Sequence, residues 1–169
     1  MVKPFSGRRP CVGAVVAVVL LAALASSVRP AEAAEISAFV AGGKPGDKWG
    51  AGYGGMLTIT LFNIVGGEIE GAWQRGDLAD TSIGTLAAKA YVGPSIGRLV
   101  PYVGLGVGVY RESLPAKTDQ GSSGLVFAGA KLKFPFGLVI RAEYQRLKLP
   151  DEVLVPLDNR YLFAAGLSF

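Results

Sequence analysis

Strict alternation of apolar residues with small or polar ones runs through most of this chain, and its last nine residues show the pattern most clearly. There Tyr161, Phe163 and Phe169 share one parity, while the other parity is small or mixed. Because strand side chains point alternately to opposite faces, the pattern predicts a strand with one apolar face. The strand ends on the aromatic Phe169. A closed barrel tolerates such an end because its last strand pairs with its first and leaves no free edge.

Seven further segments alternate in the same way, and no helical periodicity competes with them beyond residue 34. The eight predicted strands are 36–41, 49–61, 65–75, 83–92, 100–111, 125–134, 138–147 and 161–169. Tight connections alternate with longer, more polar ones. The tight ones are 62–63, 93–99 and 135–137, and the longer ones are 42–48, 76–82, 112–124 and 149–159. This alternation is typical of a barrel with short turns at one end and longer loops at the other.

The fold class predicted from these patterns is all-β, an eight-stranded antiparallel up-and-down transmembrane β-barrel. Hydrophobic residues make up 50% of the chain and charged residues only 18%. A tilted strand such as 161–169 rises on the order of 20 Å, close to the ~25 Å apolar band of an outer-membrane barrel. Aromatic residues stand near the strand ends, as expected of two interfacial girdles. The predicted girdle consists of Trp49, Trp73, Phe134, Tyr144, Tyr161 and Phe169.

Charged residues inside the predicted strands fall almost wholly on the parity opposite to the apolar one. The predicted polar core of the lumen consists of Glu68, Glu70, Lys89, Lys131, Lys133, Arg141, Glu143 and Gln145. An eight-stranded barrel is just wide enough for side chains to fill, so these charges must be paired. A hairpin through 76–82 places Glu70 opposite Lys89. Two interpretations stay open, a structural polar core and a salt-bridge gate on a narrow ion path.

Residues 1–34 have the composition of a cleaved secretory signal. Lys3, Arg8 and Arg9 precede an apolar run, and a small-x-small site places the cut near Ala33 or Ala34. We therefore expect a barrel domain over 35–169. An uncleaved inner-membrane anchor is the alternative, but the apolar run is short for one.

Composition excludes several function classes. Removing the leader leaves 13 basic and 12 acidic residues, so no electrostatic argument for nucleic-acid binding remains. The single cysteine, Cys11, lies in the leader, and the chain contains no histidine. We expect no catalytic, cofactor or metal site, because the commonest general base and most transition-metal ligands are missing. The run Gly104-x-Gly-x-Gly108 resembles a nucleotide loop only superficially, and small inward residues that relieve crowding explain it better.

The stretch 101–110, the closing Phe169 and the signal segment together resemble the small eight-stranded outer-membrane β-barrel superfamily. This superfamily includes the outer-membrane protein A-type barrel and its opacity-protein and surface-antigen relatives. The resemblance implies an exported outer-membrane protein whose Phe169 is the assembly signal read by the barrel-assembly machinery. It also implies internal salt bridges, which map by parity onto Glu68, Glu70, Lys89, Lys131, Arg141 and Glu143.

The predicted function is that of an integral outer-membrane barrel, embedded in outer-membrane lipid and monomeric, with a structural or surface-interaction role. A soluble periplasmic lipocalin-like barrel with an apolar ligand and a narrow ion-conducting barrel are the alternatives. An enzyme like the lipid A deacylases or palmitoyltransferases would need a histidine, which this chain lacks. The extracellular partner is not predicted, because the loops that choose partners contain no recognisable motif.

Overall fold

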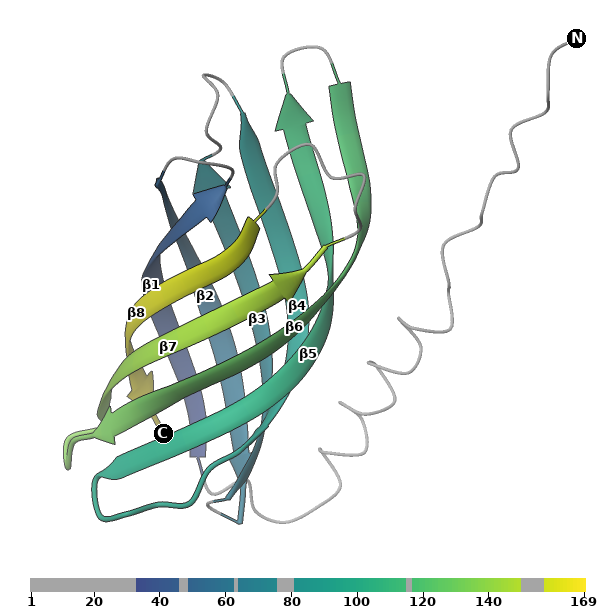
Figure 1. Cartoon of the computed structure of the whole chain (residues 1–169). Coiled ribbons are helices and arrows are strands. Elements are labelled where there is room, and N and C mark those ends of the chain that lie inside the picture. Colours follow the sequence, from purple (N-terminus) through teal and green to yellow (C-terminus); the bar gives the residue numbers. More distant parts are fainter. Residues whose placement is uncertain (1–32, 46–48, 63, 76–80, 115–116, 150–156) are drawn as a thin grey trace, which may run out of the picture. The chain divides into compact units, whose positions relative to one another are not determined.

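The computed structural model describes residues 33–45, 49–62, 64–75, 81–114, 117–149 and 157–169. Eight strands form one closed barrel in which each strand pairs antiparallel with the next and the last pairs with the first (Figure 1). The strands are β1 (Ala33–Pro45), β2 (Gly50–Leu61), β3 (Val65–Arg75), β4 (Ser82–Val92), β5 (Leu99–Leu114), β6 (Lys117–Lys133), β7 (Leu138–Lys148) and β8 (Leu157–Ser168). Within these ranges no helix is long and apolar enough to cross a membrane.

Alternation in the sequence becomes alternation of burial along each strand. In β7, Val139, Arg141 and Glu143 are buried, whereas Ile140 and Ala142 between them are exposed. The other strands follow the same rule, so the apolar parity lies outside the barrel and the polar parity lies inside. This matches the sidedness predicted from the sequence.

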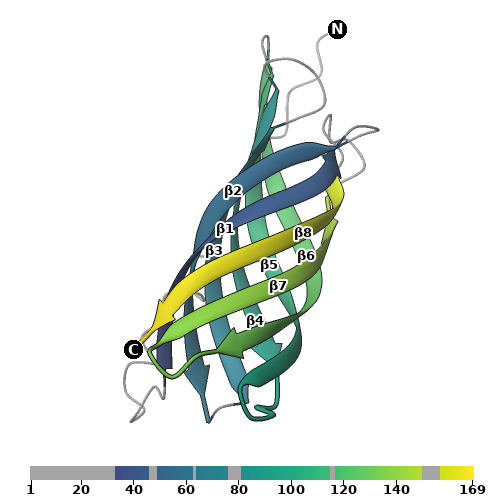
Figure 2. The ribbon, with the colours of Figure 1, turned by 90° about the vertical axis from the view of Figure 1, so that its left-hand side faces the viewer.

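The register fixes how steeply the strands tilt. Following paired residues around the barrel from Gly43 leads through Arg160, Gln145, Phe127, Gly104, Tyr91, Gly66 and Thr60 to Ala33. The path returns to β1 at a residue ten positions earlier in the chain than its start, so the pairing is staggered around the closed barrel. Such a stagger requires strands tilted relative to the barrel axis, which Figure 2 shows.

Short connections gather at one end of the barrel, together with the C-terminus (Figure 1). Residues with positive φ make these turns tight: Phe62 after β2, Gly97 before β5 and Gly137 between β6 and β7. The Gly137 amide donates to the Phe134 carbonyl at 3.1 Å, which closes the last of the three turns. Glycine adopts this left-handed conformation at little cost, and Phe62 adopts it despite its side chain.

The prediction of a loop over 112–124 is wrong, because most of these residues belong to β5 and β6. β5 and β6 stay paired through Glu112 with Asp119 and as far as Leu114 with Lys117, so only 115–116 separate them. Polar composition suggested a loop, but backbone hydrogen bonding does not depend on side-chain polarity. The result is a hairpin that extends beyond the other strands at the end opposite the C-terminus (Figure 2).

Other predicted boundaries also shift. β1 begins at Ala33 and runs to Pro45, and β8 begins at Leu157, so the predicted loops 42–48 and 149–159 are shorter than expected. Trp49, Phe134 and Phe169 lie just outside the strands to which they were assigned. Residues 1–32, most of the predicted signal segment, lie outside the described residues, so the cleavage site stays a prediction.

Candidate functional site: the charged lumen

The lumen contains two apolar clusters and a set of buried charges that contacts both of them. One cluster is built on the aromatic side chains of Tyr91, Tyr102, Tyr110 and Phe127, and a smaller one on Phe39. Glycines on neighbouring strands make room for the large rings. A Cβ added at Gly66 would lie 2.1 Å from the Tyr91 ring. Large and small residues therefore alternate around the lumen and fill it.

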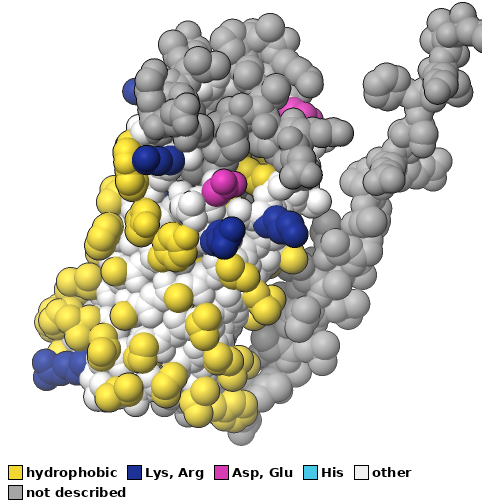
Figure 3. Space-filling model, viewed as in Figure 1, with side chains coloured by type: hydrophobic (Ala, Val, Ile, Leu, Met, Phe, Trp, Pro, Cys, Tyr) yellow, Lys and Arg dark blue, Asp and Glu magenta, His cyan; other side chains and the backbone are white. Residues whose placement is uncertain are grey.

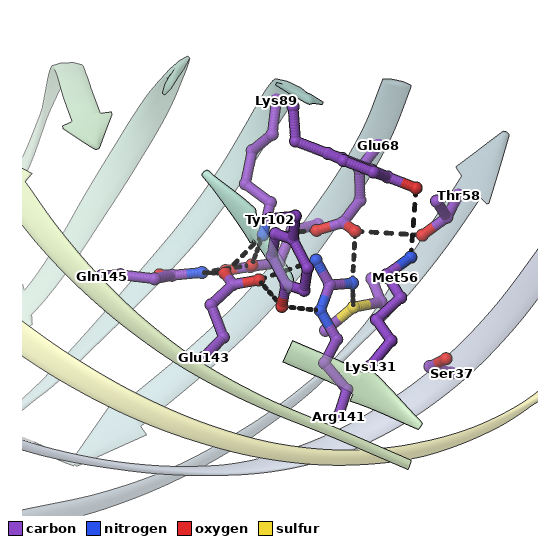
Figure 4. Close-up of polar contacts among 12 residues, drawn as sticks. Ser37, Met56, Thr58, Glu68, Lys89, Tyr102, Lys131, Arg141, Glu143 and Gln145 are labelled. Carbon is purple, nitrogen blue, oxygen red and sulfur yellow. Dashed lines mark hydrogen bonds and ion pairs between the residues drawn. The ribbon is translucent and has the colours of Figure 1, made fainter. Parts of the chain in front are cut away.

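Lys89 is the centre of the charged set. Its Nζ contacts carboxylates from two strands, lying 2.7 Å from Glu70 and 2.9 Å from Glu143 and forming a third ion pair with Glu68 (Figure 4). Only 4% of Lys89 is exposed. In the pairing of β3 with β4, Lys89 lies opposite Glu68, so the predicted cross-strand partner, Glu70, is one inward position away. The long lysine side chain reaches both carboxylates.

Arg141 holds the neighbouring part of the network. Its guanidinium pairs with Glu68 and, at 2.7 Å, with Glu143. Its Nε donates to the Tyr102 hydroxyl at 2.5 Å, and that hydroxyl donates to Glu143 at 2.7 Å. Thr58 on β2 donates to Glu68 at 3.0 Å. Five strands thus contribute to one connected group of polar atoms (Figure 4).

Two further cations complete the pairing. Arg160 from β8 pairs with Glu70, and its Nε donates to the Gln145 amide oxygen at 2.9 Å. Lys131 from β6 pairs with Glu35 at 3.0 Å, and its Nζ lies 4.8 Å from the centre of the Tyr91 ring. The buried ion pairs of these described residues balance in charge, because they join four cations to four carboxylates. The cations are Lys89, Lys131, Arg141 and Arg160, and the carboxylates are Glu35, Glu68, Glu70 and Glu143.

The geometry fits a salt-bridge hub better than a metal site or a catalytic one. Carboxylate oxygens of Glu68, Glu70 and Glu143 lie within 4.8 Å of one another, a spacing that a metal ion could bridge. The Lys89 ammonium, however, contacts all three and supplies the positive charge that such a cluster needs. A buried charge that already has good partners has little to gain from another ligand.

The structure places seven of the eight predicted lumen residues in buried positions, namely Glu68, Glu70, Lys89, Lys131, Arg141, Glu143 and Gln145. Lys133 differs: it is half-buried at the end of β6, beside the short turns. The sequence prediction missed Glu35 and Arg160, because Glu35 fell between the leader (1–34) and the strand 36–41, and Arg160 fell between the loop 149–159 and the strand 161–169. Their parity was the available signal, because Arg160 continues the inward series of Leu162.

The predicted girdle residues lie at both ends of the barrel. Trp49 stacks on Tyr161 with their ring centroids 6.1 Å apart, and the Tyr161 and Tyr144 ring centroids lie 5.2 Å apart. Trp73 packs against Tyr53 with a centroid separation of 5.3 Å. At the other end Phe134 is half-buried and Phe169 is exposed.

Comparison with known proteins supports the fold. No protein-family model matches the chain, and no curated protein sequence matches it. The N-terminal β-barrel domain of Pseudomonas aeruginosa OprF is 18% identical with a TM-score of 0.63, over 81% of this chain and 97% of that one. Neisserial surface protein A is 13% identical with a TM-score of 0.60, over 80% and 94%. Ail, the attachment invasion locus protein of Yersinia pestis, is 21% identical with a TM-score of 0.54, over 81% and 98%.

A de novo designed transmembrane β-barrel has the same fold, with 15% identity and a TM-score of 0.54 over 84% of this chain and 98% of that one. A barrel of this kind can therefore exist without any evolved surface task, and fold alone does not decide function. The predicted eight-stranded antiparallel up-and-down barrel is confirmed. The chain has the fold of the small eight-stranded outer-membrane β-barrels.

Proposed function

We propose that this protein is an integral outer-membrane barrel with a structural or surface-interaction role, and that its lumen is closed by paired charged side chains. The observation that carries the proposal is the distribution of side chains, which is inverted relative to a soluble protein. Large apolar residues such as Leu105 (65% exposed) and Phe163 (65%) cover the outside, while Lys89 and Arg141 are buried. Only a hydrocarbon surrounding makes such an outer face favourable.

Figure 3 supports the same conclusion, because hydrophobic side chains cover the middle and lower part of the barrel face that it shows. The Lys and Arg side chains on that face lie mostly above them. An outer-membrane barrel has this arrangement, with an apolar band and charged residues beyond it. We expect a monomer that the barrel-assembly machinery inserts through Phe169.

The side-chain distribution argues against the two alternatives. A lipocalin-like barrel would need an apolar interior, but the buried ion pairs occupy the lumen. A narrow ion path would have to pass the Lys89 hub, where the ammonium and three carboxylates are in direct contact. Single-channel recording in a planar bilayer tests this point, and we expect no discrete conductance steps.

Surface labelling of intact cells tests location and orientation together. Gln120→Cys places a thiol on the exposed hairpin of β5 and β6, and Phe136→Cys places one in the exposed turn at the opposite end. A membrane-impermeant maleimide should label the first variant in whole cells and the second only after lysis. Recovery of the parent chain as a soluble monomer without detergent would contradict the proposal.

A further inference from the structure

Basic residues form an outward-facing belt at the end of the barrel opposite the C-terminus. Every strand that runs toward this end has an exposed Lys or Arg among its last four residues: Lys44 in β1, Arg75 in β3, Arg111 in β5, and Arg146 and Lys148 in β7. Among the described residues the one exposed carboxylate is Asp158. The described part of this rim thus carries more exposed cations than exposed carboxylates, while the adjoining connections also contain Asp47, Asp77, Asp80, Asp151 and Glu152, which lie outside the described residues.

The register brings two of these cations to the same part of the rim. Arg75 pairs with Ser82 and Arg111 pairs with Gly84, so both flank the same end of β4. The belt lies directly beyond the aromatic residues of the predicted girdle, because Arg75 follows Trp73 and Arg146 follows Tyr144 on the same parity. In a bilayer this is the depth of the lipid headgroups.

An open apolar groove of ≈550 Å³ lies on the outer surface beside this belt. It is lined by Val40, Ala41, Gly42, Trp49, Tyr161 and Phe163. Gly42 lines it beside the stacked rings of Trp49 and Tyr161, with the Trp49 ring close to the position that a Cβ of residue 42 would take. Lys44 is exposed and lies two residues beyond Gly42 in β1, where the pairing with β8 shifts register between Gly43 and Pro45. The groove therefore has apolar walls, and an exposed cation follows it along β1.

We propose that this groove binds one acyl chain of an anionic lipid, with Lys44 contacting the lipid headgroup. The inference rests on the proposed membrane location. An acyl chain suits the groove because its lining is apolar and opens toward the bilayer, and an anionic headgroup complements the exposed cation that follows it along β1. The stacked rings of Trp49 and Tyr161 form part of the wall that the chain would contact.

Tryptophan quenching by brominated lipids tests the proposal, because Trp49 lines the groove and the chain has only one other tryptophan, Trp73. The Trp73→Phe variant is reconstituted in mixed vesicles of phosphatidylcholine and phosphatidylglycerol, with bromine on the chains of one lipid at a time. We expect phosphatidylglycerol to be favoured at Trp49 about fivefold, which corresponds to the ~1 kcal/mol that one basic residue contributes near an anionic surface. Lys44→Gln should remove most of this preference.

Filling the groove supplies the matched comparison. A Cβ added at Gly42 would lie 3.4 Å from the Trp49 ring, so Gly42→Leu occupies the groove and should abolish the preference. Gly71→Leu is the control, since Gly71 lies on the outward parity of β3 and an added Cβ there meets nothing within 4 Å. Arg98→Gln removes a cation near the short turns and should likewise change nothing.

Three outcomes would overturn the inference. Equal quenching by the two lipids, in a parent chain that has inserted into the vesicles, shows that the groove does not select an anionic lipid. A preference that persists in Gly42→Leu assigns it to the belt alone. Energy transfer between differently labelled copies that Gly42→Leu abolishes shows that a second copy occupies the groove. Failure of the parent chain to insert into vesicles would instead contradict the membrane location.

Discussion

The outer surface and the lumen of this barrel lie on opposite sides of the same strands, yet they depend on different interactions. Outward residues such as Ile140 and Leu105 are exposed, and any apolar side chain of similar size would serve there. Inward residues such as Arg141 and Lys89 are buried and contact specific partners on distant strands. The outer face therefore depends on composition, whereas the lumen depends on the identity of each residue.

Removing the hub cation tests this difference most strongly. Lys89→Met leaves Glu68, Glu70 and Glu143 close together without the ammonium that contacts all three. Breaking a buried ion pair from one side costs about 3–5 kcal/mol, and the loss here should reach at least that range. Urea unfolding of the reconstituted protein measures the change in the free energy of unfolding.

Lys133→Met is the matched control, because this lysine is half-buried at the end of β6. The control should change the free energy of unfolding by no more than about 0.5 kcal/mol, as expected for a substitution away from a buried network. If the two variants lose similar stability, the charged lumen does not hold the barrel together as described.

The outer face was predictable from the sequence because strand periodicity is a local property. Parity alone assigned Ile69 and Trp73 to the outside and Glu68 and Glu70 to the inside, and the burial pattern agrees. Partner choice inside the lumen was not predictable. Lys89 and Glu143 are 54 residues apart, and only the register of several strands brings them to 2.9 Å. Parity identifies inward residues but does not identify the neighbours that they meet.

Strand ends show the same limit. The sequence prediction treated polar residues as loop residues, so it ended the fifth strand at Arg111 and began the eighth at Tyr161. The structure extends them to Leu114 and back to Leu157, because strands continue as long as the backbone finds partners. Arg160 was missed for this reason, although it belongs to the charged network.

A charge placed on the outer face should be the next largest perturbation. Leu105 lies near the middle of β5, where the residue is 65% exposed. Leu105→Arg should cost roughly 2–4 kcal/mol, because an arginine near the bilayer midplane must leave water. Val109→Arg, two positions from Arg111 and close to the basic rim, should cost only about 0–1 kcal/mol. Equal stability of the two variants in lipid vesicles would mean that the outer face does not meet hydrocarbon.

Adding a single methyl group compares the two faces without changing any charge. A Cβ at the inward Gly104 would lie 2.2 Å from the Ala90 carbonyl oxygen and 2.5 Å from the Phe127 ring, so the backbone has to move. Gly104→Ala should therefore cost about 1–3 kcal/mol through overpacking. At the outward Gly67 an added Cβ meets nothing within 4 Å, and Gly67→Ala should be neutral or stabilise by up to about 1 kcal/mol, because the unfolded chain loses freedom. If both alanines prove neutral in urea unfolding, the lumen is looser than its glycines indicate, and its large rings do not require them.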